Sequence, residues 1–83
     1  MSEATAYRIG TIAGRRVGPA VQRNRARRLM REAMRHLRPR LRGDRPSAIL
    51  VSARPEIVSA TMQTVLAEIE ALLAARGLLV GEP

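Results

Sequence analysis

The 83-residue chain contains no cysteine, phenylalanine, tryptophan or lysine, and its one aromatic residue is Tyr7. The absence of cysteine excludes disulfides and thiolate metal sites. Without Phe and Trp, the core must consist of aliphatic side chains and methionine, and the aromatic platforms on which many single-strand binders stack bases are missing. No apolar run approaches the roughly 18 residues of a membrane span, and the first residues lack the apolar segment of a secretory signal. We therefore expect a cytoplasmic protein with no membrane partner.

Charge of one sign is in excess. The chain has 15 Arg against seven acidic residues, which gives a net charge of +8. A domain this basic is expected near a polyanion, and each guanidinium offers a planar fork that suits bidentate phosphate contacts. The length allows one small domain over 1–83, and we expect flexible ends at 1–6 and 78–83.

The pattern of apolar residues, glycine and proline predicts four elements in the order β-α-β-α. They are a strand over 7–13, a helix over 19–38, a strand over 47–53 and a helix that ends at Arg76. The first helix ends at Pro39, because the residue before a proline is pushed out of the α region. This order predicts an α+β fold in which two helices pack on a two-stranded sheet.

Two further details of the fold can be predicted. The centre of the second strand, 49–51, is apolar on both faces, which indicates that both faces are covered. The second helix is capped by Ser59 or begins near Pro55. Gly77 stands where a left-handed C-terminal cap is expected.

The helix over 19–38 separates into two sides when its residues are placed 100° apart. The apolar side holds Ala26, Leu29, Met30, Ala33 and Leu37, and the other side holds Asn24, Arg27, Arg28, Arg31, Arg35 and Arg38. Between positions 23 and 38 there are seven Arg and one Glu, and like charges one turn apart repel. A polyanion would offset this repulsion by neutralisation and counterion release. The alternative is a merely solvated face, which suits mixed charges better than this run of one sign.

The candidate polyanion-binding residues lie in and just before this helix. They are Arg15, Arg16, Arg23, Asn24, Arg25, Arg27, Arg28, Arg31 and Arg35. Arg15 and Arg16 precede the helix N-terminus, whose free N–H groups can bind phosphate. The amide of Asn24 can bond a base edge or a backbone group, and a local cap is about equally compatible with its position.

No residue pattern indicates protein-based catalysis. His36 stands alone, without a nucleophile or carboxylate arrangement beside it, and the seven carboxylates are scattered along the chain. The glycines do not form a dinucleotide or P-loop motif. We therefore predict no catalytic residue, no bound cofactor and no metal ligand in the protein itself.

The stretch 14–35, GRRVGPAVQRNRARRLMREAMR, resembles the signature of the protein subunit of bacterial ribonuclease P. That pattern is a basic pair, V-G, then A-V-x-R-N-R-x-[KR]-R-x-x-R-E. It is matched here by Arg15-Arg16-Val17-Gly18, Ala20-Val21, Arg23-Asn24-Arg25, Arg27-Arg28 and Arg31-Glu32. The resemblance covers about residues 8–76.

The resemblance implies a partner and a role. The helix carrying the RNR motif would bind the catalytic RNA of ribonuclease P, and the protein would assist that RNA in removing 5′ leaders from precursor tRNA. Catalysis would belong to the RNA and to magnesium bound by it. The implied fold is that of the ribonuclease P protein, related to a ribosomal-protein domain, with a left-handed β-α-β crossover against the usual right-handed rule.

One departure from the family concerns the N-terminal side. The family has a helix, two strands and a Phe-rich segment before the residue matching Arg8, and the segment before Arg8 is too short to hold them. Contact with the precursor leader is therefore in doubt, whereas RNA anchoring is retained. A naturally shortened protein, a misassigned first residue and a fragment all fit this departure. A two-stranded sheet with open edges has only marginal stability on its own. We therefore predict a homodimer formed through the sheet edges, or folding that occurs only on binding RNA.

Two other classes of function compete with this reading. A DNA-binding or nucleoid-type module would set the basic helix in a major groove, although the preceding helix of a helix-turn-helix is missing. A non-specific polyanion-binding domain, or a helix lying on an anionic membrane, would need no particular RNA.

Overall fold

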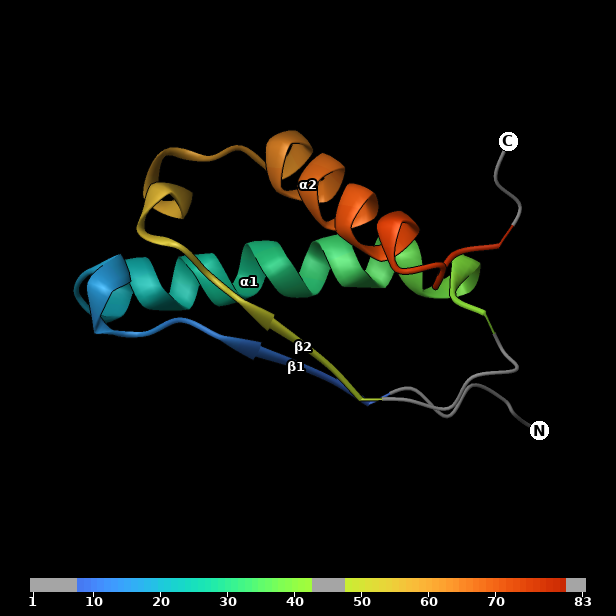
Figure 1. The fold of residues 1–83 in the computed structure, drawn as a ribbon. Helices are drawn as coiled ribbons and strands as arrows, with labels where there is room; N and C mark the ends of the chain where they lie inside the picture. The colour runs from blue at the N-terminus through green and yellow to red at the C-terminus, as the bar shows by residue number, and fades with distance from the viewer. Residues whose placement is uncertain (1–7, 43–47, 81–83) are drawn as a thin grey trace.

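A computed structural model describes residues 8–42 and 48–80. Its elements are β1 (Arg8–Ile12), η1 (Arg15–Val17), α1 (Ala20–Leu37), η2 (Arg38–Arg40), β2 (Ala48–Ser52), η3 (Pro55–Ser59) and α2 (Met62–Ala75), where η marks a 3-10 helix. The predicted β-α-β-α order is confirmed (Figure 1). Some of the predicted positions lie outside the described residues: the strand ends at Tyr7 and Ser47 and the chain ends at 1–6 and 81–83.

The sheet consists of β1 and β2, which pair in parallel with Ile9 opposite Ile49 and Ile12 opposite Ser52. Parallel neighbours need a crossover, which α1 supplies. Figure 1 shows the two strands side by side, with α2 lying obliquely along α1. The fold is thus α+β, as predicted, and the left-handed course of the crossover stays a prediction.

The turn before α1 depends on Gly18. Its φ of 139° lies in the region that L side chains rarely adopt, and an added Cβ would collide with the side chain of Gln22. Pro19 then precedes the first helical residue, Ala20, in an extended conformation. At the other end α1 stops at Leu37, one residue before the prediction, and the chain passes through Pro39 as a tight 3-10 turn.

The core forms around one stripe of α1. The stripe consists of Ala26, Met30, Ala33, Met34 and Leu37, each at most 3% exposed. Val65, Ile69 and Leu73 of α2 pack in the same cluster, as does Ile57 of η3. Prediction and structure differ at two positions of α1: Leu29 is only half-buried, and the unpredicted Met34 is buried.

The prediction that both faces of β2 are covered is wrong. Leu50 is 66% exposed and Ile12 of β1 is 44% exposed, whereas Ile49 and Val51 pack against the core. Within the described residues the helices cover one face of the sheet, so an apolar run at the centre of β2 leaves Leu50 toward solvent.

The start of α2 also differs from the prediction. The cap is Thr61, whose Oγ1 accepts a hydrogen bond of 3.2 Å from the backbone N–H of Thr64. Ser59 instead ends the separate 3-10 helix η3, which begins at Pro55. The predicted left-handed cap is confirmed, since Gly77 has a φ of 70°.

The flexible end predicted from residue 78 is wrong for 78–80. Leu79 is 7% exposed and forms an antiparallel bridge with Leu41. The backbone N–H of Arg42 donates to the carbonyl of Leu78 at 2.9 Å, and that of Val80 to Arg40 at 2.8 Å. An apolar residue at 79 therefore anchors the segment in the core.

The cap of α2 gives a first prediction. Thr61→Ala should lower the free energy of unfolding by about 1 kcal/mol, because an N–H of the first turn loses its side-chain acceptor. Ser59→Ala is the matched control and should cost clearly less, since its hydroxyl only donates to the carbonyl of Glu56 at 3.3 Å. Urea denaturation measures both; a larger loss for Ser59→Ala would contradict the placement of the cap.

Candidate nucleic-acid interface

The polar side of α1 carries four arginines, Arg27, Arg28, Arg31 and Arg35, together with Asn24; we call these five residues the basic face. Arg27 is half-buried, and the other four residues are exposed. They span three turns of the helix, and the buried stripe on the opposite side fixes the direction in which they point. Five of the six residues predicted for the polar side therefore lie on one surface of α1, whereas Arg38 lies beyond the helix, in η2.

Two side-chain contacts order the basic face. Asn24 Oδ1 accepts a hydrogen bond of 2.6 Å from Nη2 of Arg27. Glu32 pairs with Arg35 at 3.1 Å, where the side chains are 43% and 76% exposed. Such exposed contacts add little stability. Their effect is to orient two guanidinium groups and to leave the amide N–H groups of Asn24 available to another acceptor.

A second group of arginines lies at the N-terminal end of α1. Arg15 and Arg16 are exposed in η1, directly before the turn at Gly18. Arg23, in the first turn of the helix, is half-buried. No side chain caps the N-terminus of α1, and no acidic residue lies in its first turn. The structure thus places these three arginines near the positive end of the helix dipole.

Arg25 behaves differently from the other predicted site residues. Its guanidinium donates to backbone carbonyls of η3 and of the residue that follows it, with Nη2 at 3.0 Å from the oxygen of Ala60. Through these side-chain bonds Arg25 joins α1 to a segment that is distant in the sequence. Sequence alone could not separate it from its neighbours, because η3 is more than 30 residues away.

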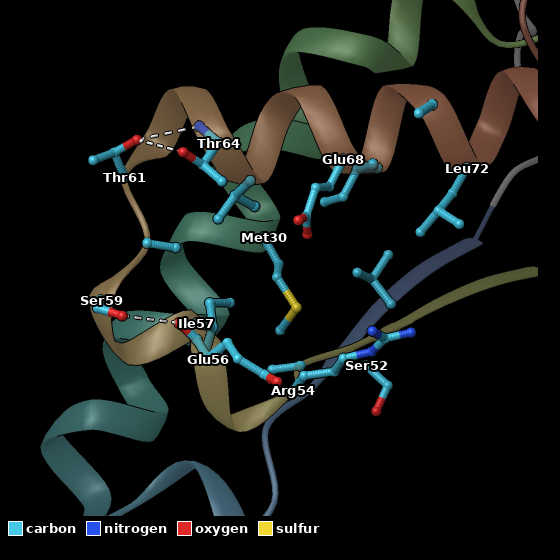
Figure 2. A pocket seen from close by; sticks show the side chains of 16 residues that line it. Met30, Ser52, Arg54, Glu56, Ile57, Ser59, Thr61, Thr64, Glu68 and Leu72 are labelled. Atoms are coloured by element: carbon cyan, nitrogen blue, oxygen red, sulfur yellow. Dashed lines mark hydrogen bonds between the residues drawn. The ribbon is translucent and has the colours of Figure 1, made fainter.

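A groove of about 760 Å³ lies between β2, η3 and α2, away from the basic face. Met30 of α1 and Glu68 of α2 point into it (Figure 2). Arg54 and Glu56 also line it, so its charge is mixed and its floor is apolar. The sequence did not indicate this groove, because its lining comes from segments that are distant in the sequence.

Other polar side chains among the described residues link elements of the fold. Arg40 of η2 pairs with Glu70 of α2 at 2.7 Å, with side chains 35% and 43% exposed. Across residues 8–42 and 48–80, no three His, Asp or Glu side chains gather where a metal ion could bind. Over the same described part of the chain, no helix has the length and apolar character needed to cross a membrane.

A small α+β protein with an arginine-rich helix exposed along one side belongs to the class whose surface suits the backbone of a nucleic acid. A family model described as Ribonuclease P matches residues 1–76 of the chain. The chain therefore belongs to the ribonuclease P protein family.

Relatives with related sequences agree with this assignment. The ribonuclease P protein component of Chloroflexus aurantiacus is 46% identical over 66 residues, which are 80% of this chain and 48% of that protein. The corresponding protein of Symbiobacterium thermophilum is 41% identical over 78 residues, covering 94% of this chain and 66% of that protein. The chain thus spans about half the length of the Chloroflexus relative.

The fold has a counterpart among solved structures. The ribonuclease P protein of Staphylococcus aureus superposes with a TM-score of 0.72 at 22% identity, covering 92% of this chain and 67% of that one. The predicted family fold is therefore confirmed for the shared part.

The exposure of the basic face gives a second prediction. Arg31→Ala should change the free energy of unfolding by no more than about 0.5 kcal/mol. The sign should be stabilising, because Arg31 lies one turn from both Arg27 and Arg35 and like charges at this spacing repel. Urea denaturation at low salt measures the change. The control is Met30→Ala, which should cost about 2 kcal/mol or more at a 2% exposed site; equal losses would contradict the exposure of the basic face.

Proposed function

We propose that this chain is the RNA-binding protein component of ribonuclease P and assists the catalytic RNA in removing 5′ leaders from precursor tRNA. The observation that carries the proposal is the basic face of α1, presented by a helix whose opposite side forms the core. The family assignment and the names of the relatives support RNA, and not DNA, as the partner.

The basic face would act on the phosphate backbone. Each exposed guanidinium can make two parallel N–H···O bonds to one phosphate, and neutralised phosphates release condensed counterions. The contact between Asn24 and Arg27 holds one such fork in place before RNA arrives, which reduces the ordering cost of binding. RNA binding relieves the repulsion among the arginines. The same positive charge that destabilises the free protein therefore stabilises the complex.

The N-terminal end of α1 would supply a second phosphate contact. Arg15 and Arg16 stand beside an uncapped helix N-terminus, where N–H groups and the helix dipole favour an anion. Arg23 adds a third positive charge from the first turn. The protein would contribute binding and charge neutralisation only; cleavage and magnesium binding are assigned to the RNA, and a cytoplasmic location is part of the same proposal.

A comparison of two double variants tests the surface. Arg27→Gln with Arg31→Gln should weaken binding to the catalytic RNA of ribonuclease P and reduce the slope of log K against log salt by about one to two. Arg54→Gln with Arg76→Gln removes the same charge from other elements and should leave the slope nearly unchanged. Equal weakening by both pairs would mean that net charge alone drives binding. Duplex DNA as competitor distinguishes RNA from a general polyanion.

Reconstitution tests the activity. Added to the catalytic RNA at low magnesium, the chain should raise the rate of precursor-tRNA cleavage, because bound protein lowers the charge that magnesium must otherwise screen. The variant with Arg27→Gln and Arg31→Gln should require more protein for the same rate. Tight RNA binding without any stimulation would contradict the assisting role.

A homodimer is the second part of the proposal. Leu50 and Ile12 expose apolar surface on the uncovered face of the sheet, and each strand has one neighbour within the described residues. Unpaired strand edges and exposed apolar side chains favour association. Analytical ultracentrifugation should show a dimer that Leu50→Thr weakens and Leu72→Thr, a similarly exposed residue of α2, leaves intact. A monomer at all concentrations would contradict this part.

A further inference from the structure

We infer that Arg25 acts as a clamp that positions η3 on α1 and does not serve as a ligand of RNA phosphates. The residues of the RNR motif would then have different roles. Asn24 orients Arg27 on the basic face, and Arg25 stabilises the fold that presents this face. The RNA half of the inference rests on the proposed function, whereas the clamp itself does not.

The clamp consists of three hydrogen bonds from one guanidinium. Nη1 of Arg25 donates to the carbonyl oxygens of Ile57 and Val58, each at 3.4 Å. Nη2 donates to the carbonyl oxygen of Ala60 at 3.0 Å, which makes this the shortest of the three. The partners are 32 to 35 residues from Arg25 in the sequence, so the bonds join two separate elements.

The carbonyls at the end of η3 can accept such a donor, and that of Ile57 does so in addition to its bond from the backbone N–H of Ala60. The last carbonyls of a helix have no partner within it and carry partial negative charge. η3 has no basic residue in its own last turn. Arginine near a helix C-terminus can bond these carbonyls, and here α1 supplies the arginine from outside. Charge-assisted bonds of this kind are stronger than neutral ones.

The position of Arg25 on α1 explains why it is available for this role. Successive residues of a helix lie 100° apart, so Arg25 stands beside the basic face that includes Asn24 and toward the half-buried Leu29. Arg28 and Arg31 point away from the core by comparison. To reach a phosphate bound on the basic face, Arg25 would have to give up its bonds to η3.

The clamp also determines the geometry of the neighbouring segments. η3 leads through Ala60 to Thr61, the cap of α2, and Ile57 of η3 is buried in the core. Ile57 and Ala60 also line the groove beside α2. Loss of the Arg25 bonds should therefore loosen η3 first and the start of α2 with it, while the distant end of α1 keeps its packing.

Three variants test the inference: Arg25→Ala, Arg25→Lys and Arg31→Ala. Arg25→Ala should lower the folding equilibrium constant about tenfold, since three charge-assisted hydrogen bonds are lost, one of them part-buried. Arg25→Lys keeps the charge but has no planar fork, so it should recover little of this loss. Arg31→Ala removes the same charge as Arg25→Ala and should not lower the unfolding midpoint; the relief of repulsion described above should raise it slightly.

Two further measurements separate a clamp from a phosphate ligand. In native-state hydrogen exchange, the N–H of Ala60, which donates to the carbonyl of Ile57, should lose protection in both Arg25 variants before the centre of α1 does. In RNA titrations corrected for unfolded protein, the salt slope should match the parent for Arg25→Ala and should be reduced by about one for Arg31→Ala.

The opposite pattern would overturn the inference. That pattern is parent-like stability and exchange in Arg25→Lys, or a reduced salt slope in Arg25→Ala with unchanged stability. If Arg25→Ala does not fold, Arg25→Lys supplies the comparison. If neither the parent nor any variant binds the catalytic RNA, the proposed function fails, and the unfolding and exchange data still decide whether Arg25 is a clamp.

Discussion

The burial of one side of α1 is the interaction on which the rest of the structure depends. Met30 and Met34 are each 2% exposed, and Ala26 and Ala33 between and beside them are 1% and 0% exposed. In a chain without Phe or Trp, flexible methionines fill the space that aromatic rings would occupy, while the alanines let neighbouring elements approach. The strands, η3 and α2 all pack against this stripe.

The same packing determines what the opposite side can do. Because the stripe holds α1 in one rotation, the arginines that alternate with it are held toward solvent. Their mutual repulsion acts against a fold that gains little from so small a core. When a phosphate backbone is bound, the electrostatic free energy of the arginines becomes favourable. The arginines therefore destabilise the free protein and stabilise its complex with RNA. Both effects follow from the positions of the apolar residues along α1.

The sequence predicted those features that depend on local pattern. The order of elements, the extent of α1 to within a residue or two, and the left-handed Gly77 followed from periodicity, proline and glycine. What it missed depends on contacts between distant segments. Leu50 was predicted to be covered, but apolar character does not reveal how many layers pack on a strand.

The site shows the same limit. The helical pattern identified Arg27, Arg28, Arg31 and Arg35 as one surface, and the structure places them together. Arg25 has the same chemistry and nearly the same neighbours in the sequence, yet it is bonded to η3, whose position only the folded chain defines. The cap of α2 is similar: Ser59 and Thr61 are both good caps, but Ser59 belongs to the 3-10 helix η3, so Thr61 caps α2.

Directed cleavage of RNA can test whether the basic face of α1 binds the catalytic RNA of ribonuclease P. The chain contains no cysteine, so a single cysteine can be placed at a chosen position. A single cysteine replaces either Val21, which is 79% exposed beside the basic face, or Gln63, which is exposed on α2. An iron chelate is attached to the cysteine of each variant. In the complex with the catalytic RNA of ribonuclease P, the chelate generates hydroxyl radicals that cut nearby RNA. We expect defined cuts in the RNA from position 21 and few from position 63. Cuts from position 63 alone would contradict RNA binding by the basic face.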